Sequence, residues 1–378
     1  MNSFRLLGLA MMLAGLTEAR GEIRMPHITS QGMETRAVAD GGLAAAVREA
    51  APKGGPVWIG YAAPVIDQRG KMCCFDSVES IDKDPRCCST CRLEQRQSWG
   101  SFSMDDGRGN GGAKVHLEPS GYFVVLLRVD QGRVGKIRAF SDDCALDSGR
   151  VPFVWLTGVS VSDSLQYLGR FVTAKESEAD LGSDDPGEKL SGQALDAIAK
   201  HAGPEADRLL EKFIARGQPF SVREQASFWI GESRGRAGYE ILKRFVGANG
   251  DPDDEFRKKV LFALSQNPTP EAIETMISVA RNDAEPQVRG EAIFWLAQKA
   301  GDQVARVISQ AIDDDPDTEV KKKAVFALSQ LPPDEGVPLL IGLAKKHRNP
   351  AVRKEAVFWL GQSADPRALD FIESVLRS

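Results

Sequence analysis

An eleven-residue phrase that recurs every 32 to 34 residues constrains the fold of this chain more than any other feature of its sequence. Its copies read VREQASFWIGE from Val222, FRKKVLFALSQ from Phe256, VRGEAIFWLAQ from Val288, VKKKAVFALSQ from Val320 and VRKEAVFWLGQ from Val352. A weaker copy, ALDAIAK over 194–200, precedes the first. Units of this length bury their apolar faces only by stacking on one another, so residues 191–378 are predicted to form a solenoid.

Each repeating unit contains two helical patterns. The phrase itself places Val320, Ala324 and Leu328 on one face, which is the spacing of a buried helix stripe. The segment after the phrase is apolar at the same spacing, and prolines separate the segments from one another. We therefore expect about six helix pairs stacked in a superhelix.

The helix pairs resemble HEAT repeats, and in particular the short HEAT-like class named after phycobilisome lyases. The resemblance covers about residues 188 to 378, and its residues are the V-R-x-x-A phrase and an acidic residue six positions before the basic one. These acidic and basic positions are Asp251 and Arg257, Asp283 and Arg289, and Asp315 and Lys321. The resemblance implies that they form a hydrogen-bonded ladder through the stack. Gly217 and His347 break the pattern in the first and last units.

The resemblance also implies a binding surface, because HEAT-like repeats mostly bind other proteins and line a concave face with one helix of each pair. Phenylalanine and glutamine recur four residues apart on the phrase helix. The predicted partner-binding residues are Phe262, Phe294, Phe326, Phe358, Gln266, Gln298, Gln330 and Gln362. The alternative is that each phenylalanine packs against the next repeat and is mostly buried. We also expect alternating Lys and Glu, such as Lys323 and Glu355, to pair across the stack.

The first residues have the pattern of a secretory signal peptide. Arg5 precedes the apolar run Leu6 to Leu16, and small residues follow it. The run is too short to span a membrane, and we expect no membrane span in the mature chain. We therefore expect a signal peptide over 1–21 and an exported protein, either periplasmic or secreted.

Six cysteines lie in the first half of the chain and none in the second. They are Cys73, Cys74, Cys87, Cys88, Cys91 and Cys144. In an oxidising compartment an even number of cysteines favours disulfides, with fifteen possible connectivities for three bridges. The C-x-x-C spacing of Cys88 and Cys91 leaves two alternatives open, a zinc site and a thiol-redox motif.

The rest of the first half predicts a small, mostly-β domain over 22–172. A short helix is expected near Leu43 to Ala50, strands at 57–61 and 151–156, and a hairpin with strands at 122–129 and 134–140. Ser162 to Leu168 is expected to open a helix. An acidic linker over 173–190 would join this domain to the solenoid, which makes the predicted fold class an α+β chain of two domains.

The composition limits the classes of function that we expect for this chain. The formal net charge is −5, with no strongly basic domain, so we expect no nucleic-acid partner. Only four histidines are present, and no catalytic constellation is visible, so we expect no metal, no cofactor and no enzyme activity. The sequence predicts a scaffold that binds a partner protein on the solenoid, with the Cys-rich domain as a second contact or a regulator. The alternatives are a thiol-redox or metal-dependent sensor or enzyme, and a bilin lyase.

Overall fold

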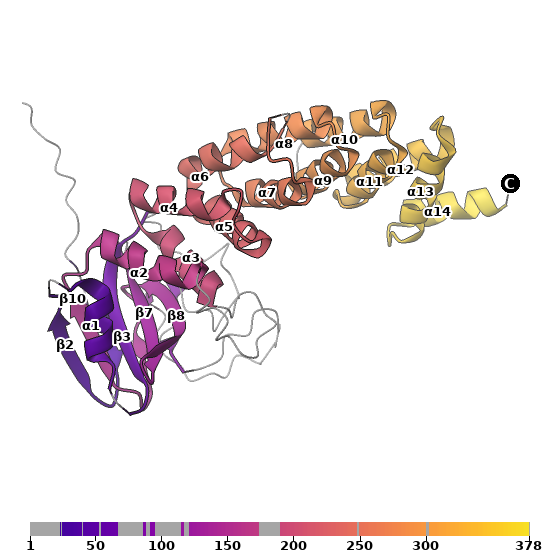
Figure 1. The fold of residues 1–378 in the computed structure, drawn as a ribbon. Helices are drawn as coiled ribbons and strands as arrows, with labels where there is room; N and C mark the ends of the chain where they lie inside the picture. The colour runs from indigo at the N-terminus through magenta and orange to yellow at the C-terminus, as the bar shows by residue number, and fades with distance from the viewer. Residues whose placement is uncertain are drawn as a thin grey trace, which may run out of the picture.

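The computed structural model describes residues 23, 25–39, 41–52, 54–66, 86–87, 91–94, 115–116, 121–173, 190–247, 249–299 and 302–377. Figure 1 shows a sheet with helices against it, from which a long stack of helices extends to the C-terminus. The predicted signal peptide, residues Cys73, Cys74 and Cys88, and nearly all of the predicted acidic linker lie outside the described residues.

A five-stranded mixed sheet forms the first part of the chain. Its strands, in spatial order, are β2 (Met33–Ala37), β10 (Phe153–Thr157), β3 (Val57–Pro64), β7 (Tyr122–Asp130) and β8 (Arg133–Ser141). β10 is parallel to both of its neighbours, and β3, β7 and β8 are antiparallel. The predicted hairpin is confirmed as β7–β8, and its turn residues Gln131 and Gly132 both have positive φ, as a two-residue hairpin turn requires.

Short strands complete the first part of the chain. β1 (Ile28–Thr29) and β5 (Cys91–Arg92) both pair with β9 (Leu146–Asp147), and β4 (Arg86–Cys87) pairs with β6 (Val115–His116). The β9 pairings hold Cys91 and Leu146 opposite each other beside the main sheet.

The central strands β10, β3 and β7 are buried on both faces of the main sheet, whereas the edge strand β2 is largely exposed. On one face, residues such as Ile59 and Leu127 pack under α1 (Gly42–Ala50) and α2 (Val161–Thr173). On the other face, Trp58 and Leu126 pack in a smaller cluster that contains Cys91 and Cys144. Burial on both faces explains the continuous apolar run of β7, which lacks the alternation of a half-exposed strand.

Six helix pairs follow within residues 190–377. They are α3 (Leu190–Lys200) with α4 (Pro204–Ile214), α5 (Phe220–Ser233) with α6 (Gly235–Leu242), α7 (Asp254–Gln266) with α8 (Pro270–Asn282), α9 (Pro286–Ala297) with α10 (Asp302–Asp314), α11 (Thr318–Ser329) with α12 (Pro333–Lys346), and α13 (Pro350–Gly361) with α14 (Pro366–Leu376). Figure 1 shows α5, α7, α9 and α11 in one row and α6, α8 and α10 in another. The predicted fold class is confirmed.

The sheet and the first helix pair share one hydrophobic core. Helix α2 packs on α3, and α3 also covers the edge strand β8, where Gln193 accepts a hydrogen bond from the Ile137 amide at 2.7 Å. Buried apolar residues run without a break from the sheet into the solenoid. The solenoid is therefore built directly onto the sheet.

A buried polar network fastens this junction. The Tyr61 and Ser164 hydroxyls lie 2.8 Å apart, and the Ser164 hydroxyl lies 2.8 Å from Nε2 of His201. Arg234, from the second helix pair, donates to the carbonyls of Ala199 and His201 and forms an ion pair with Asp207. The network connects β3, α2 and the first two helix pairs, so it fixes where the solenoid begins.

Candidate functional site

A ladder of ion pairs joins successive helix pairs along the solenoid. In each case an arginine near the start of one phrase helix reaches an aspartate in the turn before the next. The pairs are Arg223 with Asp251 at 2.5 Å, Arg257 with Asp283 at 3.0 Å, and Arg289 with Asp315 at 2.7 Å. The ladder that the resemblance implied is therefore present, and each ion pair crosses from one repeat to the next.

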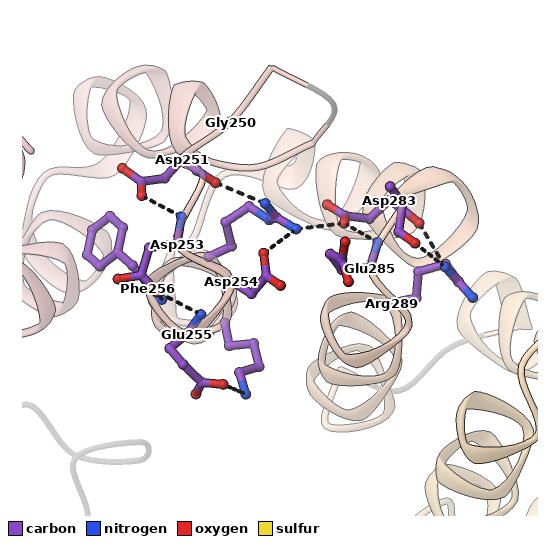
Figure 2. Close-up of polar contacts among 12 residues, drawn as sticks. Gly250, Asp251, Asp253, Asp254, Glu255, Phe256, Asp283, Glu285 and Arg289 are labelled. Atoms are coloured by element: carbon purple, nitrogen blue, oxygen red, sulfur yellow. Dashed lines mark hydrogen bonds and ion pairs between the residues drawn. The ribbon is translucent and has the colours of Figure 1, made fainter.

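Each aspartate of this ladder also organises its own turn. The Asp251 side chain accepts a hydrogen bond from the amide of Asp253, and the Asp283 side chain accepts one from the amide of Glu285 (Figure 2). Asp253 then caps α7 by accepting from the amides of Glu255 and Phe256. Each carboxylate thus binds an amide of the turn before its own helix and also binds the arginine of the neighbouring repeat.

The ladder changes at its far end. Lys321 has no carboxylate partner among the described residues and donates instead to the carbonyls of Ile312 and Asp313. Burial, and next the charge of Arg348, lower the pKa of Lys321 from its ordinary value. At the aspartate position stands His347, whose Nδ1 accepts the amide of Asn349 as the aspartates do in the other turns.

The phenylalanine rings of the phrase helices form a second ladder, which we call the Phe ladder. Its members are Phe228, Phe262, Phe294, Phe326 and Phe358. Phe228 stacks on Phe262 with ring centroids 5.8 Å apart, and Phe294 stacks on Phe326 at 6.0 Å. Trp295 and Trp359 bridge the remaining steps, contacting Phe262 at 4.7 Å and Phe326 at 4.6 Å. Ring contacts thus run through five repeats without interruption.

The Phe ladder is partly buried and partly exposed, so it agrees in part with each interpretation of the sequence: packing between repeats and a surface open to a partner. Four of its rings are half-buried, because each packs against aromatic rings of its own or a neighbouring repeat, whereas Phe358 is exposed. Of the predicted glutamines, Gln266 is half-buried, and Gln298, Gln330 and Gln362 are exposed. The rings therefore join the repeats and still present an apolar edge to solvent.

A small cleft lies beside the Phe ladder between the last two repeats. Its volume is about 220 Å³. Gln330, Gln362 and Trp359 line it together with apolar residues such as Leu340. Ligand pockets for small molecules usually measure about 300 to 1,000 Å³, so this cleft suits a single side chain of a partner protein better. Sequence reasoning did not predict it, because residues from three helices form it.

The predicted pairing across the stack is not seen: among the described residues, no ion pair joins members of the series Lys259, Glu291, Lys323 and Glu355. Lys259 pairs instead with Glu224, which lies outside the series, at 2.6 Å. The two glutamates of the series form hydrogen bonds within their own helices. Glu291 and Glu355 each accept a hydrogen bond from the indole of their own helix, Trp295 and Trp359, at 2.9 Å. These glutamates fix the tryptophans that bridge the Phe ladder.

The described cysteine side chains are buried. Cys91 and Cys144 both lie in the smaller core cluster behind the main sheet. The backbone of Cys87 lies in β4, and the other three cysteines are outside the described residues. Cys91 is disulfide-bonded and so carries no thiol, and Cys144 lacks the solvent access that a reactive thiol needs. Within the described part of the chain, no group of three or more His, Cys, Asp or Glu side chains could hold a metal ion. No described helix has the length and apolar character needed to cross a bilayer.

Comparisons with known proteins agree with this architecture. A family model described as HEAT repeats matches residues 304–378. No curated protein sequence matches the chain. Human deoxyhypusine hydroxylase in complex with glycerol is a similar solved structure, with 17% identity over 56% of this chain and 88% of that one, and a TM-score of 0.23.

Two further solved structures are similar. The Escherichia coli protein YibA has 20% identity over 50% of this chain and 67% of that chain, with a TM-score of 0.34. The CpcE–CpcF complex of phycocyanin lyase from a Nostoc species has 16% identity over 56% of this chain and 81% of that chain, with a TM-score of 0.27. These likenesses concern the fold alone.

They nevertheless correct one expectation. The sequence-based prediction of a chain without enzyme activity is wrong as an inference from the repeats, because proteins named as a hydroxylase and a lyase share this type of solenoid. The physical reason is that a repeat scaffold positions side chains without prescribing their chemistry. The family model identifies HEAT repeats over residues 304–378, and the helix pairs and the Arg–Asp ladder continue the same repeating architecture from residue 190 to the last described helix.

Proposed function

We propose that the chain is an exported scaffold whose solenoid holds a partner protein along the Phe ladder. The observation that carries this proposal is the continuous row of ring contacts from Phe228 to Phe358, most of whose members keep an edge in solvent. Aromatic rings contribute large contact areas at low cost in conformational entropy, which is why they dominate protein interfaces.

The spacing of the Phe ladder suggests the form of the partner. Rings about 6 Å apart along a stack favour an extended or helical segment whose apolar side chains lie across several repeats. The cleft beside Trp359 would take one of these side chains. Gln298 and Gln330 flank the ladder and are exposed, so their amides can bond to the backbone of the bound segment.

We also propose that cysteines of the first domain, Cys91 among them, form structural disulfides after export. The burial of Cys91 and Cys144 in one core cluster supports a structural role for them. The first domain would then be a rigid mount for the solenoid. N-terminal sequencing of the protein from an envelope fraction tests export, and a start near residue 22 is the expected result.

Affinity capture from the native cell envelope fraction tests the scaffold. We expect the double variant F294E/F326E to lose a partner that the wild type captures, because carboxylates replace adjoining rings of the ladder. Gln330→Ala is a milder second variant, since it removes an exposed amide and leaves the stacked rings intact. The matched control is Leu339→Glu on α12, an exposed apolar residue outside the ladder.

Circular dichroism melts would confirm that each variant remains folded. Equal capture by the wild type, F294E/F326E and the Leu339 control would sink the proposal and direct attention to the first domain. Loss of capture in the Leu339 control alone would place the partner on the α12 side of the stack.

A further inference from the structure

Within the described residues, the main sheet has one covered edge and one open edge. The edge strand β8 lies under α3, where Gln193 accepts a hydrogen bond from the Ile137 amide. The opposite edge strand, β2, pairs with β10 alone, and four of its five residues are exposed. Figure 1 shows β2 as the outermost strand, away from the helices of the solenoid. An open strand edge is a template on which another strand can pair.

The pairing with β10 determines which backbone groups of β2 point outward. Gly32 and Val38, which flank β2, both bond to β10, through the Gly32 carbonyl and the Val38 amide. Because the backbone groups of successive strand residues alternate in direction, the even-numbered residues between them also face β10. The amides and carbonyls of the odd-numbered residues, Met33, Thr35 and Ala37, therefore point away from the sheet, and no described strand pairs with them.

Two opposite charges lie on one face of β2. Glu34 and Arg36 are two residues apart, so their side chains share the face that carries α1. Arg36 donates hydrogen bonds to Glu34 and to the carbonyl of Glu49 in α1. The Glu34 and Arg36 side chains are nevertheless 55% and 36% exposed. Charges of a single sign would repel a second copy of this strand, whereas opposite charges allow one to pair.

These charges decide how a second copy of β2 would pair with the first. In an antiparallel pair with its two-fold axis at Glu34, two glutamates would face each other, and an axis at Arg36 would bring two arginines together. An axis at Thr35 instead places Glu34 of each copy opposite Arg36 of the other. This register pairs all five residues of each strand. It also joins the outward-facing Met33, Thr35 and Ala37 in pairs that exchange both N–H···O bonds.

We propose that the chain forms a homodimer in which the β2 strands of two copies pair antiparallel about Thr35 and join two five-stranded sheets into one continuous sheet. Each Arg36 then lies between the Glu34 of its own strand and the Glu34 of the other, so opposite charges alternate across the junction. The solenoids leave this pairing free, because each is attached through α3 at the β8 edge, at the far end of the joined sheet.

An extended segment of another protein is the alternative occupant of the β2 edge. Such a segment would gain the same backbone hydrogen bonds. Its side chains would match Glu34 and Arg36 only if it carried opposite charges two residues apart in the reverse order across the pair. β2 itself is such a sequence, so the charges favour a second copy of this chain.

Sedimentation equilibrium of the full-length chain measures the dimer. Because the paired strands are short, we expect a dissociation constant on the order of 10–100 μM, as for weak interfaces of small area. Arg36→Glu and Glu34→Arg each place like charges opposite one another, and each should weaken dimerisation by about tenfold or more. The matched control is Arg133→Glu, which makes the same charge change at an exposed residue of the other edge strand, β8, and should leave the dimer unchanged.

A mixture of the two charge variants separates loss of pairing from misfolding. One variant carries two arginines on this face of β2 and the other carries two glutamates, so the mixture should form heterodimers although neither variant dimerises well alone. Glu34→Gln identifies the register. It removes an attraction from a dimer centred on Thr35 and should weaken that dimer, whereas it would strengthen a dimer centred on Glu34 by removing a repulsion.

Hydrogen exchange gives a second measurement of the same edge. The amides of Met33, Thr35 and Ala37 should exchange more slowly as the concentration of the wild-type chain rises, because only the dimer bonds them. In Arg36→Glu, their exchange should not depend on concentration over the same range.

Three results would overturn the proposal. The first is a wild-type chain that stays monomeric at every concentration, which would leave the β2 edge to an extended segment of another protein. The second is a dimer that Arg36→Glu and Arg133→Glu weaken equally, and the third is a mixture of charge variants that forms no heterodimer. None of the variants changes the Phe ladder, so this test and capture through Phe294 and Phe326 fail independently.

Discussion

The Ser164 hydroxyl of α2 lies 2.8 Å from Nε2 of His201, which comes directly after α3, and the bond joins the sheet to the solenoid in a fully buried position. The chemistry of the partners sets the direction of the hydrogen bonds. The Ala197 carbonyl can only accept, so His201 donates to it from Nδ1 at 2.8 Å. Nε2 then accepts from Ser164, and Ser164 accepts from Tyr61, whose hydroxyl lies 2.8 Å away. Nε2 accepts rather than donates because burial lowers the pKa of His201 to about 4, which leaves the imidazole neutral near pH 7.

The pH dependence of unfolding should report this histidine. Burial lowers the pKa of His201 to about 4, against an ordinary value of 6.5. Above pH 6.5 the folded and unfolded states are both neutral there. As the pH falls from 6.5 to 4, the unfolded state takes up the proton first, and the chain loses stability by about 3 kcal/mol. Urea denaturation at pH 7 and pH 4.5 measures this.

The control for that prediction is His201→Gln, whose side-chain oxygen can accept from Ser164 without titrating. The difference in unfolding free energy between pH 7 and 4.5 should be smaller in the variant than in the wild type. An identical pH dependence would show that His201 does not limit acid stability.

The Arg–Asp ladder predicts unequal costs for equivalent arginines. Arg257→Ala leaves the carboxylate of Asp283 buried without its cation and should cost about 3 to 5 kcal/mol. Arg353→Ala removes only hydrogen bonds to two carbonyls at the end of the stack and should cost about 1 kcal/mol. Urea denaturation compares the two. Equal losses would show that the ladder does not stabilise the interior of the solenoid.

Two equivalent glycines should respond oppositely to alanine. Gly231→Ala puts a methyl group against the backbone of α7 and should destabilise the chain by about 3 kcal/mol. Gly361→Ala meets open space and should be neutral or stabilising by up to about 1 kcal/mol, since alanine favours helix more than glycine does. Thermal melts of the two variants give the comparison. A similar decrease in both would contradict the packing described for α5 and α7.

His347→Asp should restore the ladder beside Lys321. The carboxylate would accept the amide of Asn349, as the imidazole Nδ1 does now, and would also raise the pKa of Lys321. We expect a gain of about 1 to 2 kcal/mol in urea denaturation at pH 7. His347→Asn keeps the acceptor without the charge. A gain shared by the Asn variant would show that Lys321 is not the cause.

The solenoid could be predicted from the sequence because the same apolar spacing and the same helix-start prolines recur in successive repeats. The apolar spacing around Val320 and the prolines at the helix starts gave six pairs, and the Asp283–Arg289 spacing pointed to the ladder. The β7–β8 hairpin was predicted because Gly132 comes after an apolar run and allows positive φ.

The junction could not be predicted in the same way. Tyr61, Ser164 and His201 are more than a hundred residues apart at their extremes, and each occurs once. No periodicity marks residues that meet only in the folded chain. The same holds for the cleft around Trp359. It also holds for the exposure of Phe358, because a ring of this series is covered only where another repeat packs over it.

Because the sheet and α3 share one core, the two ends of the solenoid should resist a pulling force to different degrees. Each helix pair contacts only its neighbours, so a force that pulls on α14 would detach the pairs one after another, beginning with α13 and α14. That unzipping would meet its strongest resistance where Arg234 clasps the first two pairs and where Ser164 and His201 join them to the sheet. The sheet thus acts as a fixed anchor, and the solenoid acts as an arm that yields from its tip.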